Sequence, residues 1–133
     1  MSIPDPELRR QLDAFNTKYN ETHDKNDPAA MAALFTEDAV IVSNGGPFEG
    51  QQAIKKYYTD NFAAFHYAKH VSVIDPSSPH PIDESTMWAT GSWSLTIQAK
   101  GEDPIPLNGY WSTIYVREGD VWKEKMQTWN MSA

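Results

Sequence analysis

The chain has 133 residues, 18 acidic against 11 basic side chains, and a formal net charge of −7. Its 5 Phe, 5 Trp and 6 Tyr can fill one sizeable core, so a single domain over residues 1–133 is expected. The lack of cysteine excludes disulfides, thiolate metal sites and cysteine nucleophiles, and the acidic balance argues against a nucleic-acid partner.

The N-terminal segment "MSIPDPELRR" has no apolar stretch typical of a signal peptide. No segment approaches the roughly 20 apolar residues that span a bilayer. We therefore expect a soluble, cytoplasmic protein with no membrane partner.

The first half of the chain predicts three helices and one strand. Asp5-Pro6-Glu7 and Asp27-Pro28 are helix starts, with a capping side chain before a proline at the first helical position. "DAVIVS" is a β-branched run that favours a strand, and "NGGP" ends it. Helical spacing returns from Gln51 to about Phe65. Apolar side chains at helical spacing are Leu8, Leu12, Phe15 and Tyr19 in the first helix, and Ile54, Tyr58, Phe62 and Phe65 in the third.

The second half predicts four strands separated by turns. The strands are "HVSVID", "STMWATGSWSLTIQA", "LNGYWSTIYVRE" and "VWKEKMQTWN", and the turns are "PSSPHPID", "KGEDPIP" and "EGD". Short turns make sequential strands antiparallel neighbours. The order ααβαββββ indicates an α+β domain with helices on one side of a sheet.

This order and three stretches resemble the nuclear-transport-factor-2-like superfamily, especially its SnoaL-like and ketosteroid-isomerase-like members. The stretches are "NDPAAMAALFTEDAVIV", "FEGQQAIKKYY" and "GYWSTIYVREGDVWKEKMQTWN". The resemblance implies a cystatin-like cone, in which a curved sheet wraps around an apolar cavity closed by the helices. It also implies a homodimer through the outer sheet face. Members include small lyases, isomerases and cyclases as well as binding domains, so the fold alone does not choose among them.

The isomerase's catalytic residues carry over only in part. Its oxyanion-hole tyrosine falls on Tyr19, which matches. Its general-base aspartate falls on Ser43 or Asn44, and its protonated aspartic acid falls near Trp111, so both carboxyls are missing. The resemblance therefore does not imply ketosteroid isomerisation by that mechanism.

In the last strand, "DVWKEKMQTWN", alternation puts Trp122, Glu124, Met126, Thr128 and Asn130 on one face. The lysines on the other face favour water, so the Glu124 face is expected to line the cavity, with Trp129 on the outer face. A buried carboxyl has a raised pKa and can act as a general acid or base. The alternatives for Glu124 are an ion pair or a position at the rim. We expect ligand contacts from Trp111, Trp122, Met126, Thr128, Asn130 and Phe62.

Tyr19 and His23 lie four residues apart and share one helix face. Tyr19 can donate a hydrogen bond to a developing oxyanion and His23 can move a proton, or the two can be a core tyrosine and a helix cap. His66 and His70 have a metal-compatible spacing, but no third ligand is placed beside them, and no metal site is expected.

Two hypotheses follow. In the first, the chain is a small cofactor-free isomerase, dehydratase or cyclase that uses Tyr19, Glu124 and His23 on an apolar carbonyl- or hydroxyl-bearing molecule. In the second, it is a non-catalytic domain that binds a small molecule or dimerises.

Overall fold

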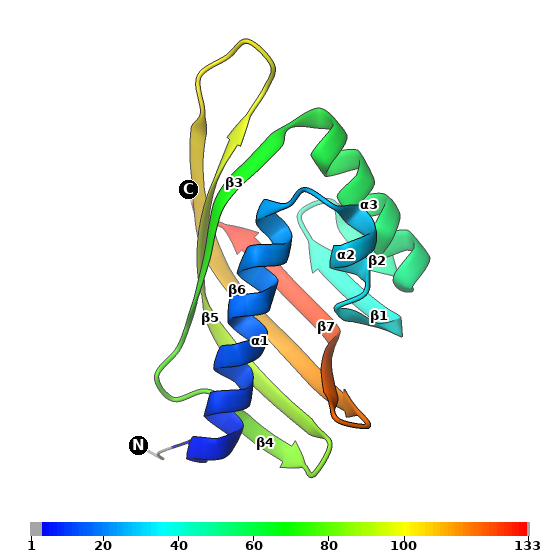
Figure 1. The fold of residues 1–133 in the computed structure, drawn as a ribbon, viewed down its shortest axis with the longest axis vertical. Helices are drawn as coiled ribbons and strands as arrows, with labels where there is room; N and C mark the ends of the chain where they lie inside the picture. Colours follow the sequence, from blue (N-terminus) through cyan, green and yellow to red (C-terminus); the bar gives the residue numbers. More distant parts are fainter. Residues whose placement is uncertain (1–3, 133) are drawn as a thin grey trace.

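The computed structural model describes residues 4–132. Within this range the helices are α1 (Pro6–Asp24), α2 (Pro28–Ala32) and α3 (Gln51–Ala64). The strands are β1 (Phe35–Ser43), β2 (Gly46–Glu49), β3 (His66–Ile74), β4 (His80–Asp83), β5 (Thr86–Gln98), β6 (Ile105–Glu118) and β7 (Val121–Met131). The α+β class is confirmed (Figure 1).

The first two helices begin where the sequence predicts. Asp5 accepts hydrogen bonds from the backbone N–H of Glu7 and Leu8 at 2.9 and 3.1 Å, and Asp27 caps α2 in the same way. Each cap satisfies backbone donors that have no partner within the helix. The third helix follows Gly50, whose φ of 90° suits a residue without a side chain.

The strands form one sheet in the order β2-β1-β7-β6-β5-β3, and β4 pairs with β5. The β1–β7 pair is parallel and the other pairs are antiparallel. Two short strands begin in segments that were predicted as turns: β2 starts at Gly46 within "NGGP", and β4 lies in "PSSPHPID". Four residues each are too few to show an alternating pattern, and both strands are held by pairing with a longer neighbour.

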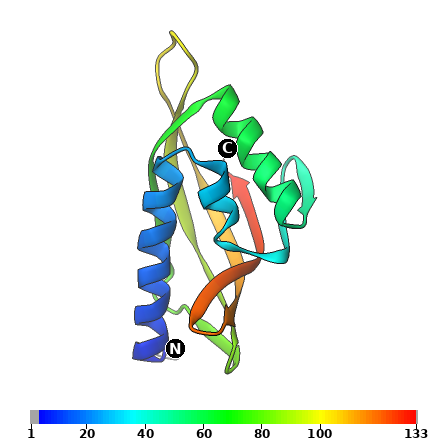
Figure 2. The same cartoon turned by 45° about the vertical axis from the view of Figure 1, so that its right-hand side comes forward.

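Figures 1 and 2 show all three helices on one face of the bent sheet. Helix α1 lies along β3, and α3 lies against β1 and β2. Two buried apolar clusters lie between the layers. One is built around Leu12 of α1 with Met87 and Tyr115 of the sheet. The other joins Met31 and Phe35 to Ile54 of α3.

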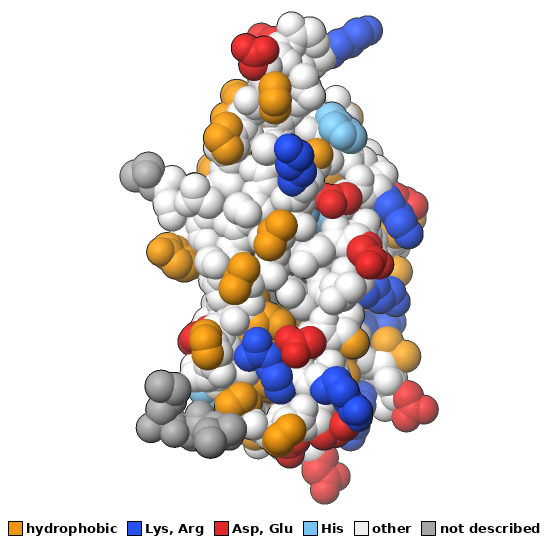
Figure 3. Space-filling model, turned by 60° about the vertical axis from the view of Figure 1, so that its left-hand side comes forward, with side chains coloured by type: hydrophobic (Ala, Val, Ile, Leu, Met, Phe, Trp, Pro, Cys, Tyr) orange, Lys and Arg blue, Asp and Glu red, His pale blue; other side chains and the backbone are white. Residues whose placement is uncertain are grey.

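The opposite face of the sheet faces solvent. Exposed apolar side chains there include Val71, Val73, Tyr110 and Met126. Figure 3 shows orange side chains spread over this side of the molecule, with charged side chains at the top, along one edge and at the lower end. Within residues 4–132, no helix is both long and apolar enough to cross a bilayer.

Candidate active site

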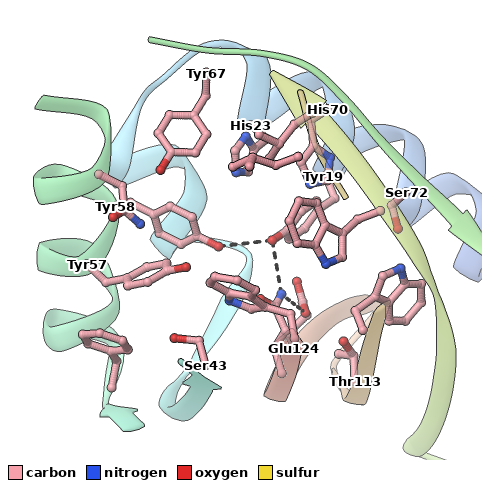
Figure 4. Close-up of a pocket in the computed structure, with 18 of the residues that line it drawn as sticks. Tyr19, His23, Ser43, Tyr57, Tyr58, Tyr67, His70, Ser72, Thr113 and Glu124 are labelled. Atoms are coloured by element: carbon pink, nitrogen blue, oxygen red, sulfur yellow. Dashed lines mark hydrogen bonds between the residues drawn. The ribbon is translucent and has the colours of Figure 1, made fainter. Parts of the chain in front are cut away.

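A cavity of about 500 Å³ lies between the helices and the concave face of the sheet. This volume falls in the range that suits a small organic ligand. Aromatic rings make up much of its wall: Phe15, Tyr19, Phe48, Tyr57, Tyr58, Phe62, Tyr67, Trp93, Trp111, Tyr115 and Trp129. Figure 4 shows the hydroxyls of Tyr19, Tyr57 and Tyr58 directed towards its centre.

Four polar side chains from three elements form a hydrogen-bonded chain along the cavity wall (Figure 4). The hydroxyls of Tyr58 in α3 and Tyr19 in α1 lie 3.1 Å apart. The Gln127 side-chain N–H groups donate to the Tyr19 hydroxyl at 3.2 Å and to Glu124 Oε1 at 2.8 Å. The chain therefore couples a phenol to a carboxyl across the cavity.

Glu124 is the last residue of this hydrogen-bonded chain, and 2% of its surface is exposed. Its backbone N–H donates to the Leu34 carbonyl at 2.9 Å, and its strand neighbours are Phe35 in β1 and Tyr115 in β6. Strand β7 is thus held on both sides, and the Glu124 side chain points inward. Within residues 4–132 it forms no ion pair, so the ion-pair alternative is not what the structure has.

The environment of Glu124 favours its neutral form. Burial raises the pKa of this carboxyl to about 8, although the hydrogen bond from Gln127 and the nearby Thr113 hydroxyl both act in the opposite direction. Its second oxygen, Oε2, is buried and has no hydrogen-bond partner among the described residues. A carboxyl with a free oxygen and a pKa near neutrality can give or take a proton.

The prediction that Met126, Thr128 and Asn130 share the face of Glu124 is wrong. The register between β6 and β7 shifts after Glu124, so one extra residue, Lys125, is inserted and the alternation changes sides. Met126, Thr128 and Asn130 consequently lie on the outer side and do not line the cavity. Lys125 forms an ion pair with Asp38 at 2.9 Å.

The residues that replace them on the cavity wall are Gln127, Trp129 and Met131. Trp129 was expected on the outer face and instead lines the cavity. Trp122 points inward but packs below the cavity, where its indole N–H donates to Gln11 Oε1 at 2.6 Å. Trp111 and Phe62 do line the cavity, as does Ser43.

Tyr19 also lines the cavity. Burial raises the pKa of its phenol, and the nearby Glu124 carboxyl acts in the same direction, so Tyr19 remains a neutral hydrogen-bond donor. Its oxygen already accepts the Gln127 N–H. When Tyr58 donates to the same oxygen, the Tyr19 hydrogen is left for a ligand.

His23 is 6% exposed and stacks on His70, with ring centroids 4.3 Å apart. Burial lowers the pKa of His70 to about 4, and burial together with His70 lowers the pKa of His23 well below its usual value. Both rings are therefore neutral at pH 7. No pattern in the sequence predicts that His70 lies against His23. That meeting depends on a shift in the β3–β5 register beside Lys69, whose φ is 56°.

Asn20 fixes the orientation of His70. The Asn20 side-chain oxygen accepts the Ser72 backbone N–H at 3.1 Å and lies 2.8 Å from His70 Nδ1, which therefore carries the hydrogen. Nε2 is left as the acceptor nitrogen. Among residues 4–132, no cluster of three His, Cys, Asp or Glu side chains could hold a metal ion.

The family model of the SnoaL-like domain matches residues 5–126. The chain belongs to this SnoaL-like family. The match covers the helix starts at Asp5 and Asp27 and most of the cavity wall, including Tyr19 and Glu124, whereas Gln127, Trp129 and Met131 lie beyond it. The comparison with curated proteins gave no match.

Solved structures share the fold of this SnoaL-like domain at low identity. A ketosteroid isomerase-like protein from Erwinia carotovora atroseptica SCRI1043 is 14% identical, with a TM-score of 0.83 over 97% of this chain and 99% of that one. A candidate scytalone dehydratase from Novosphingobium aromaticivorans is 19% identical, with a TM-score of 0.81 over 95% and 85%. A type 2 hexachlorocyclohexane dehydrochlorinase is 15% identical, with a TM-score of 0.77 over 96% and 86%.

Proposed function

We propose that this SnoaL-like domain is a small lyase or isomerase that moves a proton on an apolar, carbonyl- or hydroxyl-bearing molecule in the cavity. The observation that carries the proposal is Glu124, a fully buried carboxyl on the cavity wall whose Oε2 has no partner among the described residues. The names of the similar structures, which include an isomerase-like protein, a dehydratase and a dehydrochlorinase, support the same class of reaction.

In the proposed mechanism the ionised fraction of Glu124 removes a proton from the carbon next to a carbonyl group. Its raised pKa makes it a stronger base than an ordinary carboxylate. The C–H electron pair forms a C=C bond, and the carbonyl oxygen becomes an enolate that accepts a hydrogen bond from Tyr19.

The enolate has two outcomes with balanced bonds. In an isomerisation, protonated Glu124 returns its proton to a different carbon. In a dehydration, the enolate re-forms the carbonyl, expels a hydroxyl from the next carbon, and Glu124 supplies the proton that converts this hydroxyl to water. Both routes use only side chains of this domain, so the proposal includes no cofactor. His23 and His70 lie on the wall opposite the β7 end of the hydrogen-bonded chain and are neutral acceptors for a substrate hydroxyl (Figure 4).

The test is proton exchange. The purified protein is incubated in D₂O with a panel of hydroxy-ketones, lactones, steroids and polycyclic phenols, and proton NMR follows exchange and conversion. We expect exchange next to the carbonyl group of at least one compound, with a rate that rises as pH approaches 8. Glu124→Gln should abolish the exchange, while Glu84→Gln, at an exposed position, should leave it unchanged. Full exchange by Glu124→Gln would remove this carboxyl from the mechanism.

A binding-only function is the second candidate, and one observation favours it. The positions that correspond to the isomerase carboxyls fall on Ser43 or Asn44 and near Trp111, and none of these residues has a carboxyl; Ser43 and Trp111 line the cavity. Saturable binding of a panel compound with no exchange at any pH between 6 and 9 would decide for this candidate.

We also propose that the domain forms a homodimer through the outer face of its sheet. The exposed side chains of Val71, Val73, Tyr110 and Met126 support this proposal. Light scattering after size exclusion should give twice the 15.0 kDa chain mass, and a single-chain mass would contradict it.

A further inference from the structure

The cavity has a second polar feature that the proposed mechanism does not use. Trp93 in β5 lines the cavity, and its indole Nε1 is buried with no hydrogen-bond partner among the described residues. An indole N–H can only donate, and a buried donor left unpaired is costly. Its position on the cavity wall therefore suits a ligand that brings an acceptor.

Other tryptophans show that this is a particular property of Trp93. The Trp111 indole, on the same cavity wall, donates to the Ser92 carbonyl at 3.0 Å, and the Trp122 indole donates to Gln11. The ring of Trp93 is also held in place. It meets Trp129 edge-on with centroids 5.7 Å apart, and a side chain at Gly109 would come within 3.0 Å of it.

Trp93 and Glu124 lie at different levels of the sheet. Trp93 in β5 pairs with Gly109 in β6. Glu124 in β7 pairs with Tyr115 in β6, and Tyr115 pairs with Met87 in β5. The six residues from Met87 to Trp93 correspond to roughly 20 Å between backbone positions at about 3.3 Å per residue. The side chains of Trp93 and Glu124 enter the cavity from these two levels, so the span left for a ligand is shorter. A ligand that contacts both carries two polar groups with an apolar body between them.

The charge of the wall limits the ligand further. None of the described residues that line the cavity is a lysine or an arginine, and the acids among them are Glu124 and Asp60. An anionic ligand would lose its hydration without gaining a cationic partner. The flat aromatic walls favour a ring system that can stack or meet them edge-on.

We propose that the cavity selects an uncharged, flat ring compound with oxygens at two ends, and that Trp93 is a specificity-determining residue that donates to the acceptor oxygen at one end while the other end contacts Glu124. This proposal rests on the proposed function for the Glu124 end. The part of the proposal that concerns Trp93 is about binding alone.

The test compares three ligands that differ at one end: 6-acetyl-2-naphthol, its isopropenyl analogue in which CH₂ replaces the carbonyl oxygen, and 6-hydroxy-2-naphthoate. Calorimetry gives each dissociation constant for the unmodified protein and for two variants. We expect the unmodified protein to prefer the acetyl compound over the isopropenyl compound by about tenfold, as one hydrogen bond from a desolvated donor allows. The naphthoate should bind more weakly than the acetyl compound.

The variants separate recognition from packing. Trp93→Phe should abolish the preference by weakening only the acetyl compound, because the variant lacks the N–H donor. Any fall in its melting temperature reports the lost ring contact with Trp129 and not a lost hydrogen bond. Trp88→Phe is the matched control: its indole is exposed and does not line the cavity, so the preference should remain.

The proposal is overturned if the preference survives in Trp93→Phe, if that variant weakens both naphthols equally, if the naphthoate binds as well as the acetyl compound, or if no ligand binds. These outcomes are independent of catalysis. A Trp93-dependent preference without proton exchange in the earlier panel would retain the specificity proposal and refute the enzyme. Exchange that depends on Glu124 without such a preference would do the reverse.

Discussion

The burial of Glu124 predicts an unusual dependence of stability on pH, which Glu124→Gln should remove. The pKa of this carboxyl is about 8 in the folded chain, against an ordinary value of 4.5. Between these two values the folded state keeps the proton and the unfolded state loses it. The unfolded state therefore binds fewer protons, and the free energy of unfolding falls as pH rises.

The magnitude follows from the size of the shift. Each pH unit within the window costs about 1.4 kcal/mol, so the 3.5 units from 4.5 to 8 correspond to about 5 kcal/mol in total. Between pH 5 and pH 7, two units alone should cost about 3 kcal/mol. The stability contributed by the neutral carboxyl is complete below pH 4.5 and is lost by about pH 8.

The assay is urea unfolding of the unmodified protein and of Glu124→Gln at pH 5, 6, 7 and 8. The difference in unfolding free energy between the two proteins is the informative quantity, because the titration of His23, His70 and the surface groups is common to both. We expect Glu124→Gln to gain about 3 kcal/mol relative to the unmodified protein from pH 5 to pH 7. Parallel curves over the whole range would refute the placement of a protonated Glu124 in the core.

Three further predictions concern the rest of the fold. The buried His70 ring, with a pKa of about 4, resists the proton that the unfolded state binds, so acidification from pH 6.5 to pH 4 should cost the folded state about 3 kcal/mol. His70→Phe should remove this part of the loss. Acid titrations followed by circular dichroism would measure the dependence of stability on pH, and an unchanged dependence in the variant would contradict the prediction. Gly109→Ala should destabilise the domain by at least about 3 kcal/mol, since its new carbon would lie 1.8 Å from the Asn130 carbonyl oxygen. The control Gly45→Ala, with no neighbour closer than 3.5 Å, should change stability by no more than about 0.5 kcal/mol. Equal melting temperatures of the two variants would argue against the close approach of β6 and β7. Leu12→Ala should cost about 2–5 kcal/mol in urea unfolding, because this side chain is fully buried between α1 and the sheet, and a cost below about 1 kcal/mol would place α1 elsewhere.

The sequence alone determined the elements that local chemistry specifies. Asp5 and Asp27 predict helix starts, because each side chain caps backbone N–H groups only two or three residues away. The alternation of β7 placed Glu124 inward, because the two-residue period of a strand holds until a bulge interrupts it. The resemblance supplied the α+β cone and the position of Tyr19 on the cavity wall.

The tertiary structure decided the rest, because the remaining features depend on pairing between distant segments. The extra residue at Lys125 is a property of the β6–β7 register, and it exchanged Met126, Thr128 and Asn130 for Gln127 and Trp129 on the cavity wall. No pattern within β7 predicts this insertion, since the alternation of the strand predicts Lys125 as an ordinary outward-facing residue.

The same reason applies to the polar interior. His23 and His70 stack across 47 residues of sequence, and Tyr58 meets Tyr19 from another helix. Composition makes such rings available, and only the packing of α1 against β3 and α3 brings them to one cavity. The raised pKa of Glu124 likewise follows from how completely that packing excludes water, which is a property of the whole fold and not of the strand that carries the carboxyl.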